Sequence, residues 1–182
     1  MAAADLMARA CGVRLLTCDV DGVLTDGKIY IDEDGRELKA FSSLDGLGMK
    51  MLGRCAVTVA WVTGSRSPSV ARRAANLGIE HVILDAEDKL GAWQNLRAKF
   101  SLAPEQCAHI GDDLPDLPII VRCGLGATVP HAPEPLRRQA HYVTSTDGGR
   151  GAVRELAELI LAAKGELEAE LRAFDVVLEA RS

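Results

Sequence analysis

Short apolar runs that alternate with segments of helical periodicity constrain the fold of this chain more than any other feature. Each run has few polar interruptions, which is typical of strands buried on both faces of a sheet. The runs lie at residues 13–20, 56–64, 81–84, 107–113, 124–130 and 141–144. The helical segments lie at residues 44–55, 67–78, 89–100, 114–124, 132–140 and 149–165. This order predicts an α/β fold, a Rossmann-like and mostly parallel sheet with helices on both faces.

One segment departs from this alternation of buried strand and helix. Residues 27–41 follow the first apolar run, alternate apolar and polar side chains, and carry Asp34 and Gly35 at their centre. That pattern predicts a β-hairpin inserted after the first strand. We expect residues 1–165 to form a single domain. Residues 166–182 are a charged tail that extends the last helix, packs on a neighbouring subunit or stays loose.

Composition and charge argue against several classes of protein. The net charge of −5 in 182 residues argues against a nucleic-acid partner. The chain has no apolar run near 18 residues and no secretory signal, so we expect no membrane partner. Its five cysteines are scattered without a CxxC pair, which fits reduced thiols in the cytoplasm. The four histidines, His109 among them, show no ligand spacing and are interpreted as structural or surface residues.

Four polar clusters fall at the carboxyl ends of predicted strands, where open parallel sheets bind their ligands. The clusters are Asp19-x-Asp21, Thr63-Gly64-Ser65, Lys89 and Gly111-Asp112-Asp113. Carboxylates gathered at one edge repel one another unless a cation lies among them, and oxygen ligands suit Mg²⁺. The hydroxyl and N–H groups of a glycine turn can bind phosphate oxygens, and a lysine adds positive charge. The clusters together favour chemistry on a phosphate group.

The stretches DVDGVLTDG, VTGS, Lys89 and GDDLPD resemble the four motifs of the haloacid dehalogenase superfamily of phosphotransferases. The resemblance extends over roughly residues 13–165. It implies that Asp19 is the nucleophile, which forms an aspartyl-phosphate. It also implies that Asp21 is the general acid and then the general base. Thr63 and Lys89 would bind the phosphoryl oxygens and offset charge in the transition state.

The same resemblance implies a set of residues for the metal. Mg²⁺ would be held by Asp19, by the backbone carbonyl of Asp21 and by Asp112. Asp113 would orient ligands or waters around the ion. Asp116 has two interpretations from the sequence: it caps the helix that follows, or it belongs to the site.

The spacing of the motifs leaves no room for a cap domain. Only 41 residues separate Asp21 from Thr63, and 25 separate Thr63 from Lys89. A site without a cap is open, so another subunit is the simplest means of excluding water. The hairpin would expose apolar surface if it were left alone, and we therefore predict an oligomer. Its apolar residues are Ile29, Ile31, Leu38 and Phe41.

Within the superfamily, the pattern is most similar to the 3-deoxy-D-manno-octulosonate 8-phosphate phosphatases. The similarity rests on DVDGVLTDG, the hairpin, GDDLPDLP and GGRGAVREL. It implies Mg²⁺-dependent hydrolysis of this sugar-acid phosphate in lipopolysaccharide synthesis, by a homotetramer joined through its hairpins. The candidate substrate-binding residues are Asp21, Ser42, Ser43, Asp45, Gly46, Lys50, Gly64, Ser65, Arg66, Arg73 and Lys89.

Two positions depart from the family pattern. Leu44 stands where the family usually has an arginine before Asp-Gly, and Ser65 stands where it usually has the arginine of TGR. A sugar-acid carboxylate loses a bidentate partner with each arginine, so either Arg66 compensates or the substrate differs. The alternatives are a phosphatase for a nine-carbon sugar acid 9-phosphate and a non-catalytic oligomerisation domain. A phosphorylated receiver domain fits less well, because its acidic pair precedes its phosphorylated aspartate.

Overall fold

The computed structural model of this chain describes the backbone of residues 2–179 and the side chains of residues 2–174. Its central sheet has six parallel strands in the order β5-β4-β1-β6-β7-β8. The strands are β1 (Leu15–Cys18), β4 (Thr58–Val62), β5 (His81–Ile83), β6 (Cys107–Gly111), β7 (Leu125–Thr128) and β8 (Tyr142–Val143). Each of the six apolar runs therefore forms a strand, and the predicted α/β fold is confirmed.

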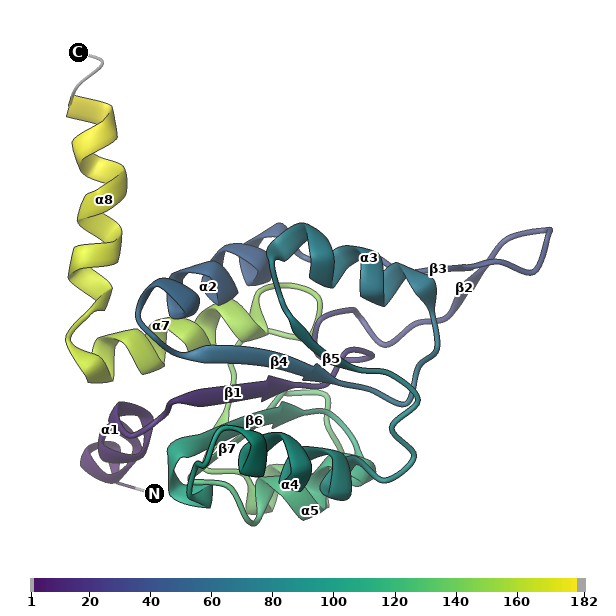
Figure 1. Cartoon of the computed structure of the whole chain (residues 1–182), viewed down its shortest axis with the longest axis horizontal. Coiled ribbons are helices and arrows are strands. Elements are labelled where there is room, and N and C mark those ends of the chain that lie inside the picture. The colour runs from purple at the N-terminus through teal and green to yellow at the C-terminus, as the bar shows by residue number, and fades with distance from the viewer. Residues whose placement is uncertain (1, 180–182) are drawn as a thin grey trace.

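Helices cover both faces of this sheet (Figure 1). On one face lie α2 (Ser43–Arg54), α3 (Pro68–Leu77) and α7 (Ala152–Lys164). On the other lie α4 (Lys89–Lys99) and α5 (Leu117–Ile120). The remaining helical elements are α1 (Ala3–Cys11), α6 (Glu134–Gln139), α8 (Leu167–Glu179) and the 3₁₀ turns η1 (Pro104–Gln106) and η2 (Leu114–Asp116). The sequence patterns did not predict α1, which packs against α7.

Successive residues of β1 enter two different hydrophobic clusters, because side chains alternate between the faces of a strand. Leu16 and Cys18 belong to the larger cluster, which also contains residues of α2 and α7. Leu15 belongs to a smaller cluster with Trp93 of α4 and Ile119 of α5. Both faces of β1 are therefore buried, which explains its nearly continuous apolar sequence.

The predicted hairpin is present and projects from the body of the molecule (Figure 1). Its strands, β2 (Tyr30–Ile31) and β3 (Glu37–Leu38), pair antiparallel and are shorter than the sequence suggested. Gly35 has a φ of 77°, a conformation that glycine adopts without steric cost, and it closes the turn. Ile29 and Ile31 are 75% and 67% exposed. The hairpin therefore presents apolar side chains to the surroundings of the chain.

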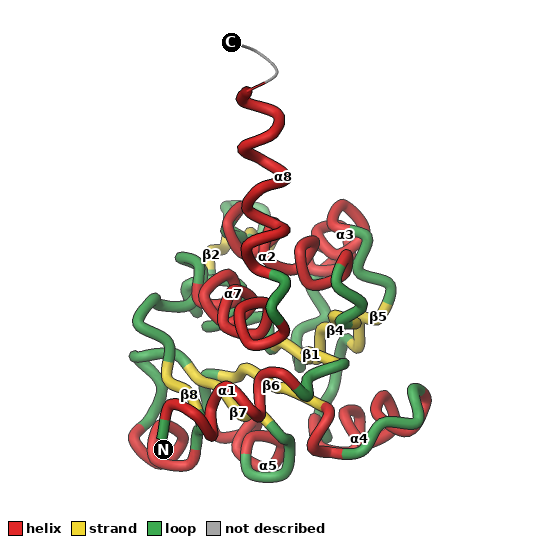
Figure 2. Tube along the Cα trace, turned by 90° about the vertical axis from the view of Figure 1, so that its left-hand side faces the viewer, coloured by secondary structure: helices red, strands yellow, loops and turns green. Residues whose placement is uncertain are grey.

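The tail forms a separate helix, so of the three alternatives for this segment the extension of the last helix does not hold. Gly165 adopts a left-handed conformation with a φ of 75° and ends α7. The next helix, α8, stands away from the sheet (Figure 2). Arg54 of α2 donates a hydrogen bond of 3.1 Å to Glu170 of α8. Residues 180–182 of the tail lie outside the described residues.

None of the helices within residues 2–179 is both long and apolar enough to cross a membrane.

Asp45 links two helices on the same face of the sheet. It lies in the first turn of α2 and is only 1% exposed. Its carboxylate accepts a hydrogen bond of 2.9 Å from the N–H of Arg154, in the first turn of α7. The first N–H groups of a helix have no partner within the helix, so this carboxylate caps α7 from a neighbouring element. Asp45 therefore connects α2 to α7 and is not available to a small molecule.

Replacing Asp45 tests this assignment against the substrate-binding one. We expect Asp45→Ala to lower the free energy of unfolding by about 2 kcal/mol, because the start of α7 loses its acceptor. For a chain of this length that corresponds to roughly 4 to 8 °C in Tm. Asp88→Ala, which removes an exposed cap of α4, is the matched control and should cost less. A variant that melts like the wild type but has a raised KM would contradict the structural role.

Candidate active site

The carboxyl ends of β1 and β6 place two acids side by side. Asp19 directly follows β1, and its N–H donates a hydrogen bond of 3.0 Å to the carbonyl oxygen of Ile110 in β6. Asp112 directly follows β6. Between these acids the chain turns at Gly22, whose φ is 87° and where a Cβ atom would overlap the carboxylate of Asp112. Glycine is therefore required at this close approach.

A third carboxylate joins these two. One carboxylate oxygen from each of Asp19, Asp112 and Asp116 lies within 4.8 Å of the others. A pocket of about 270 Å³ opens at this point of the sheet edge. It is lined by Asp19, Asp21, Gly27, Lys89, Asp112, Asp113, Pro115 and Asp116. Strand order has thus gathered the first, third and fourth polar clusters into one cavity.

Lys89 lies between two of these carboxylates. Its Nζ atom is 2.9 Å from Asp19 Oδ1 and 2.9 Å from Asp116 Oδ1. Asp88, the residue before it, caps α4 by accepting the N–H of Gly91, which fixes the start of the helix. Burial alone would lower the pKa of Lys89, but the charges of Asp19 and Asp116 raise it. The lysine is therefore a fixed positive charge in the site.

One lysine does not balance three carboxylates. Burial and the charge of Asp116 raise the pKa of Asp19 from 3.8 to about 6. Burial and the charge of Asp19 raise the pKa of Asp112 to about 8. Carboxylates that resist ionisation in this way form a fitting site for a divalent cation bound by oxygen ligands. Oδ1 of Asp116 accepts from Lys89 and His109, while its buried Oδ2 has no hydrogen-bond partner among the described residues, so all three carboxylates offer oxygen atoms to such an ion.

Asp116 belongs to the site and does not cap the following helix. It precedes α5, but its side chain makes no capping hydrogen bond there. Instead it is fully buried and contacts Lys89 and His109. His109, one of the histidines interpreted as structural or surface residues, is also fully buried. The only sequence signal for Asp116 was its place in GDDLPD.

Sequence reasoning missed Lys39. This residue follows β3, and its ammonium group forms ion pairs with Asp21 and with Glu37, the second at 2.6 Å. Its side chain is only 4% exposed. Burial alone would lower its pKa, but the hydrogen bonds to Asp21 and Glu37 raise it. The hairpin thus delivers a second positive charge to the mouth of the pocket, which no motif in the sequence indicated.

The second polar cluster forms a turn after β4. Thr63 is buried, and its hydroxyl accepts a hydrogen bond of 3.1 Å from the N–H of Ser65. Gly64 lies between them at the tip of the turn. The exposed guanidinium group of Arg66 pairs with Asp85 at 2.7 Å. Thr63 lies at the end of the strand next to β1 but does not line the acidic pocket, and Arg66 is engaged elsewhere.

Four of the remaining substrate candidates lie together where the start of α2 meets α3. Ser42 caps this helix by accepting the N–H of Leu44, and Ser43 begins it. Arg73 of α3 donates a hydrogen bond of 3.4 Å to the carbonyl oxygen of Ser42. The guanidinium group of Arg73 also lies so close to Gly46 that a Cβ atom there would be 2.7 Å from its Nη2 atom. Ser42, Gly46 and Arg73 therefore form one contact between α2 and α3.

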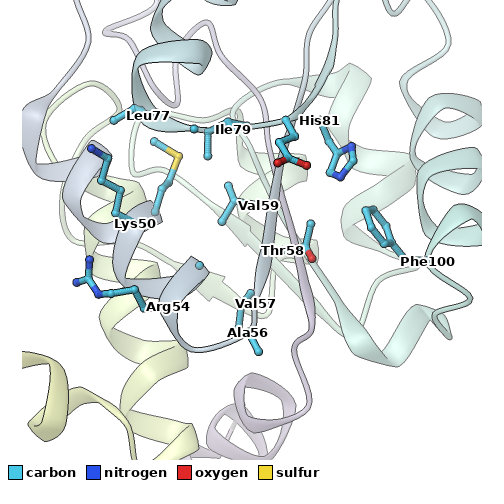
Figure 3. Close-up of a pocket in the computed structure, with 14 residues that line it drawn as sticks. Lys50, Arg54, Ala56, Val57, Thr58, Val59, Leu77, Ile79, His81 and Phe100 are labelled. Carbon is cyan, nitrogen blue, oxygen red and sulfur yellow. The ribbon is translucent and has the colours of Figure 1, made fainter.

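Asp113 lies at the exposed rim of the acidic pocket, near the proposed metal residues. Its carboxylate accepts the N–H of Leu114 at 2.7 Å and caps η2. Lys50 lines a different and larger groove of about 790 Å³ (Figure 3). This groove lies at the amino ends of β4 and β5, beside the last turns of α2 and α3. It contains no cluster of carboxylates, so its size does not make it the reaction site.

Comparison with known proteins agrees with this geometry. Residues 76–156 match the family of haloacid dehalogenase-like hydrolases. The chain is 48% identical over 164 residues to 3-deoxy-D-manno-octulosonate 8-phosphate phosphatase of Yersinia pestis, with 90% of this chain and 88% of the relative covered. The crystal structure of that enzyme superposes with a TM-score of 0.88, covering 90% of this chain and 89% of the other.

A second structure shows the ligands of a relative. The Moraxella catarrhalis phosphatase of the same name, in complex with magnesium, phosphate and the sugar acid, has a TM-score of 0.93 and 41% identity. The alignment covers 95% of this chain and 99% of that one. With this degree of identity over nearly its whole length, the chain belongs to the 3-deoxy-D-manno-octulosonate 8-phosphate phosphatase family of haloacid dehalogenase-like hydrolases.

Proposed function

We propose that this chain hydrolyses 3-deoxy-D-manno-octulosonate 8-phosphate to the free sugar acid and phosphate, with Mg²⁺ as cofactor. The observation that carries the proposal is the pocket in which Asp19, Asp112 and Lys89 meet at the carboxyl edge of the sheet. The ligands of the Moraxella relative support both the metal and the sugar acid. The reaction would supply free sugar acid to lipopolysaccharide synthesis in the cytoplasm.

The proposed chemistry divides the hydrolysis into two steps on Asp19. In the first step a carboxylate oxygen of Asp19 attacks phosphorus, and Asp21 gives a proton to the departing alcohol oxygen. In the second step Asp21 takes a proton from water, and the water oxygen displaces the Asp19 carboxylate from phosphorus. Lys89 favours the ionised form of Asp19 and offsets charge on the phosphoryl oxygens. Mg²⁺ held by Asp19, Asp112 and the carbonyl of Asp21 would supply further positive charge there.

The proposed assembly is a homotetramer joined through the hairpins. Ile29, Ile31 and Leu38 are all more than half exposed; strand alternation places Ile29 with Ile31 on one face of the hairpin and Leu38, the partner of Tyr30, on the other. Exposed apolar side chains that lie together usually mark an interaction surface. A second copy packed on this hairpin would bury them and would also close the open site near Lys39.

Replacing the proposed nucleophile tests the catalytic assignment. We expect Asp19→Asn to reduce kcat for phosphate release by about 10⁴-fold or more, because no other group can form the covalent intermediate. Asp34→Asn, which removes an exposed carboxylate at the hairpin tip, should keep wild-type activity. The assay compares the eight-carbon substrate with nine-carbon sugar acid 9-phosphates. Preference for a nine-carbon substrate would contradict the proposed substrate. Turnover by Asp19→Asn would contradict the proposed role of Asp19 as nucleophile.

The raised carboxyl pKa values predict how pH changes stability and metal binding. Asp19 and Asp112 have pKa values of about 6 and about 8 against an ordinary aspartate value of 3.8, so protonation favours the folded protein. This contribution is complete below about pH 4 and is lost as pH rises through 6 to 8. The Tm of the metal-free protein should therefore fall over that range.

Mg²⁺ should reverse this loss, since it binds the ionised carboxylates. At a hundredfold excess over Kd it should stabilise the protein by about 2.7 kcal/mol at pH 8.5, roughly 5 to 10 °C in Tm, and by less at pH 5.5. Thermal melts at both pH values measure the difference. Asp112→Asn should remove most of the Mg²⁺ response. Equal shifts of Tm at the two pH values would show that these carboxylates do not bind the ion.

A charge placed in the hairpin tests the assembly. Light scattering coupled to size exclusion should give the wild type a mass about four times the 19.4 kDa of one chain. Ile31→Lys should lower this mass, because a buried ammonium group without a partner opposes association. Val121→Lys makes the same change at an exposed apolar residue outside the hairpin and should leave the mass unchanged. A tetramer that survives Ile31→Lys would place the interface elsewhere.

A further inference from the structure

A series of hydrogen-bonded, buried polar side chains continues from the pocket into the sheet. His109 in β6 and Thr17 in β1 are both fully buried, and their strands are neighbours with these two residues in register. His109 Nε2 lies 3.0 Å from Asp116 Oδ1, and His109 Nδ1 lies 2.9 Å from the hydroxyl of Thr17. Buried polar groups in the apolar layer of a sheet are costly unless they are paired, so this series of side chains needs an explanation.

Counting donors and acceptors shows which nitrogen of His109 carries a proton. A neutral imidazole has one N–H donor and one acceptor nitrogen. With the proton on Nε2, His109 donates to the carboxylate of Asp116. The hydroxyl of Thr17 then has two acceptors for its one proton, the carbonyl oxygen of Ala108 at 3.1 Å and Nδ1 of His109 at 2.9 Å. With a proton on Nδ1 alone, the lone pair of Nε2 would face a carboxylate oxygen and leave two acceptors in contact, so Nε2 carries a proton.

This series of side chains ends at Lys89, which contacts the proposed nucleophile Asp19. Oδ1 of Asp116 accepts from both His109 and Lys89, and the same ammonium group of Lys89 contacts Asp19. Gly111 allows Asp116 its position, since a Cβ atom at residue 111 would overlap the Asp116 side chain. The orientation of Asp116, and with it the position of Lys89, therefore depends on a second donor to the same carboxylate oxygen.

We propose that His109, supported by Thr17, is a positioning residue that acts through Asp116 to hold Lys89 on the nucleophile Asp19. This inference rests on the proposed function of Asp19. A leucine would fill the same space in the sheet, but it would leave Asp116 with one donor in place of two and free to rotate away from Lys89. The role is therefore distinct from packing. It predicts a higher kcat for variants that keep a hydrogen-bond donor at position 109 than for variants that lose it.

Three variants in the full-length protein test the proposal. His109→Leu removes the donor, and His109→Gln keeps an amide N–H that can reach Asp116. Cys107→Ala changes a buried residue on the same face of β6 that does not belong to this series of polar side chains. With Mg²⁺ and 3-deoxy-D-manno-octulosonate 8-phosphate, His109→Leu should lower kcat about 10- to 100-fold, the usual cost of losing an orienting partner, and change KM less than threefold.

The control variants define what contradicts the proposal. His109→Gln should recover most of the lost kcat, and Cys107→Ala should stay within twofold of the wild type. Thermal melts confirm that each variant is folded. A folded His109→Leu variant with wild-type kcat would overturn the proposal, as would an equal loss in His109→Gln. If the wild-type protein shows no turnover that depends on Asp19, the proposed function itself is overturned.

A second measurement does not depend on turnover. In ¹H–¹⁵N spectra of the wild type, we expect a proton on Nε2 of His109 and a slowly exchanging ammonium signal from Lys89. The Lys89 signal should shift or disappear in His109→Leu and persist in Cys107→Ala. An Nε2 atom without a proton, or a Lys89 signal unchanged by His109→Leu, would show that His109 does not position the lysine.

Discussion

The mutual repulsion of carboxylates at the carboxyl edge of the sheet is the constraint on which the rest of this site depends. Parallel strands β1 and β6 end side by side, and each is followed directly by an aspartate. Asp116 adds a third carboxylate that is almost wholly removed from water. Such a cluster is costly in a folded protein unless positive charge is brought to it. The surrounding elements bring it.

Two lysines from distant parts of the chain supply that charge in different places. Lys89 is fixed at the start of α4 and contacts Asp19 and Asp116 on the inner side of the pocket. Lys39 comes from the hairpin and contacts Asp21 at the mouth. Burial, together with the negative charge that remains, raises the pKa values of Asp19 and Asp112, which is the electrostatic signature of a cation site. The hairpin therefore connects the proposed assembly of subunits to the chemistry of the site.

The sequence predicted what depends on local pattern and on strand topology. Apolar runs located the six strands, and the order of strand and helix placed Asp19, Lys89 and Asp112 at one edge. Contacts between distant segments could not be predicted in this way. Asp45 was a substrate candidate through the family resemblance, yet it caps α7 more than a hundred residues later. Lys39 lies in a segment whose pattern indicated only a hairpin, and no local signal tells which of its charged side chains turns inward.

The central claim is that Asp19 alone forms the covalent intermediate, since it is the carboxylate that Lys89 contacts at the end of β1. The most direct measurement is to quench the enzyme during turnover of 3-deoxy-D-manno-octulosonate 8-phosphate with borohydride, which reduces an aspartyl-phosphate to homoserine, and to locate the change by peptide mass spectrometry. The account predicts homoserine at position 19 only when substrate and Mg²⁺ are both present. Reduction at Asp21, Asp112 or Asp116, or continued turnover with no reduced residue, would contradict it.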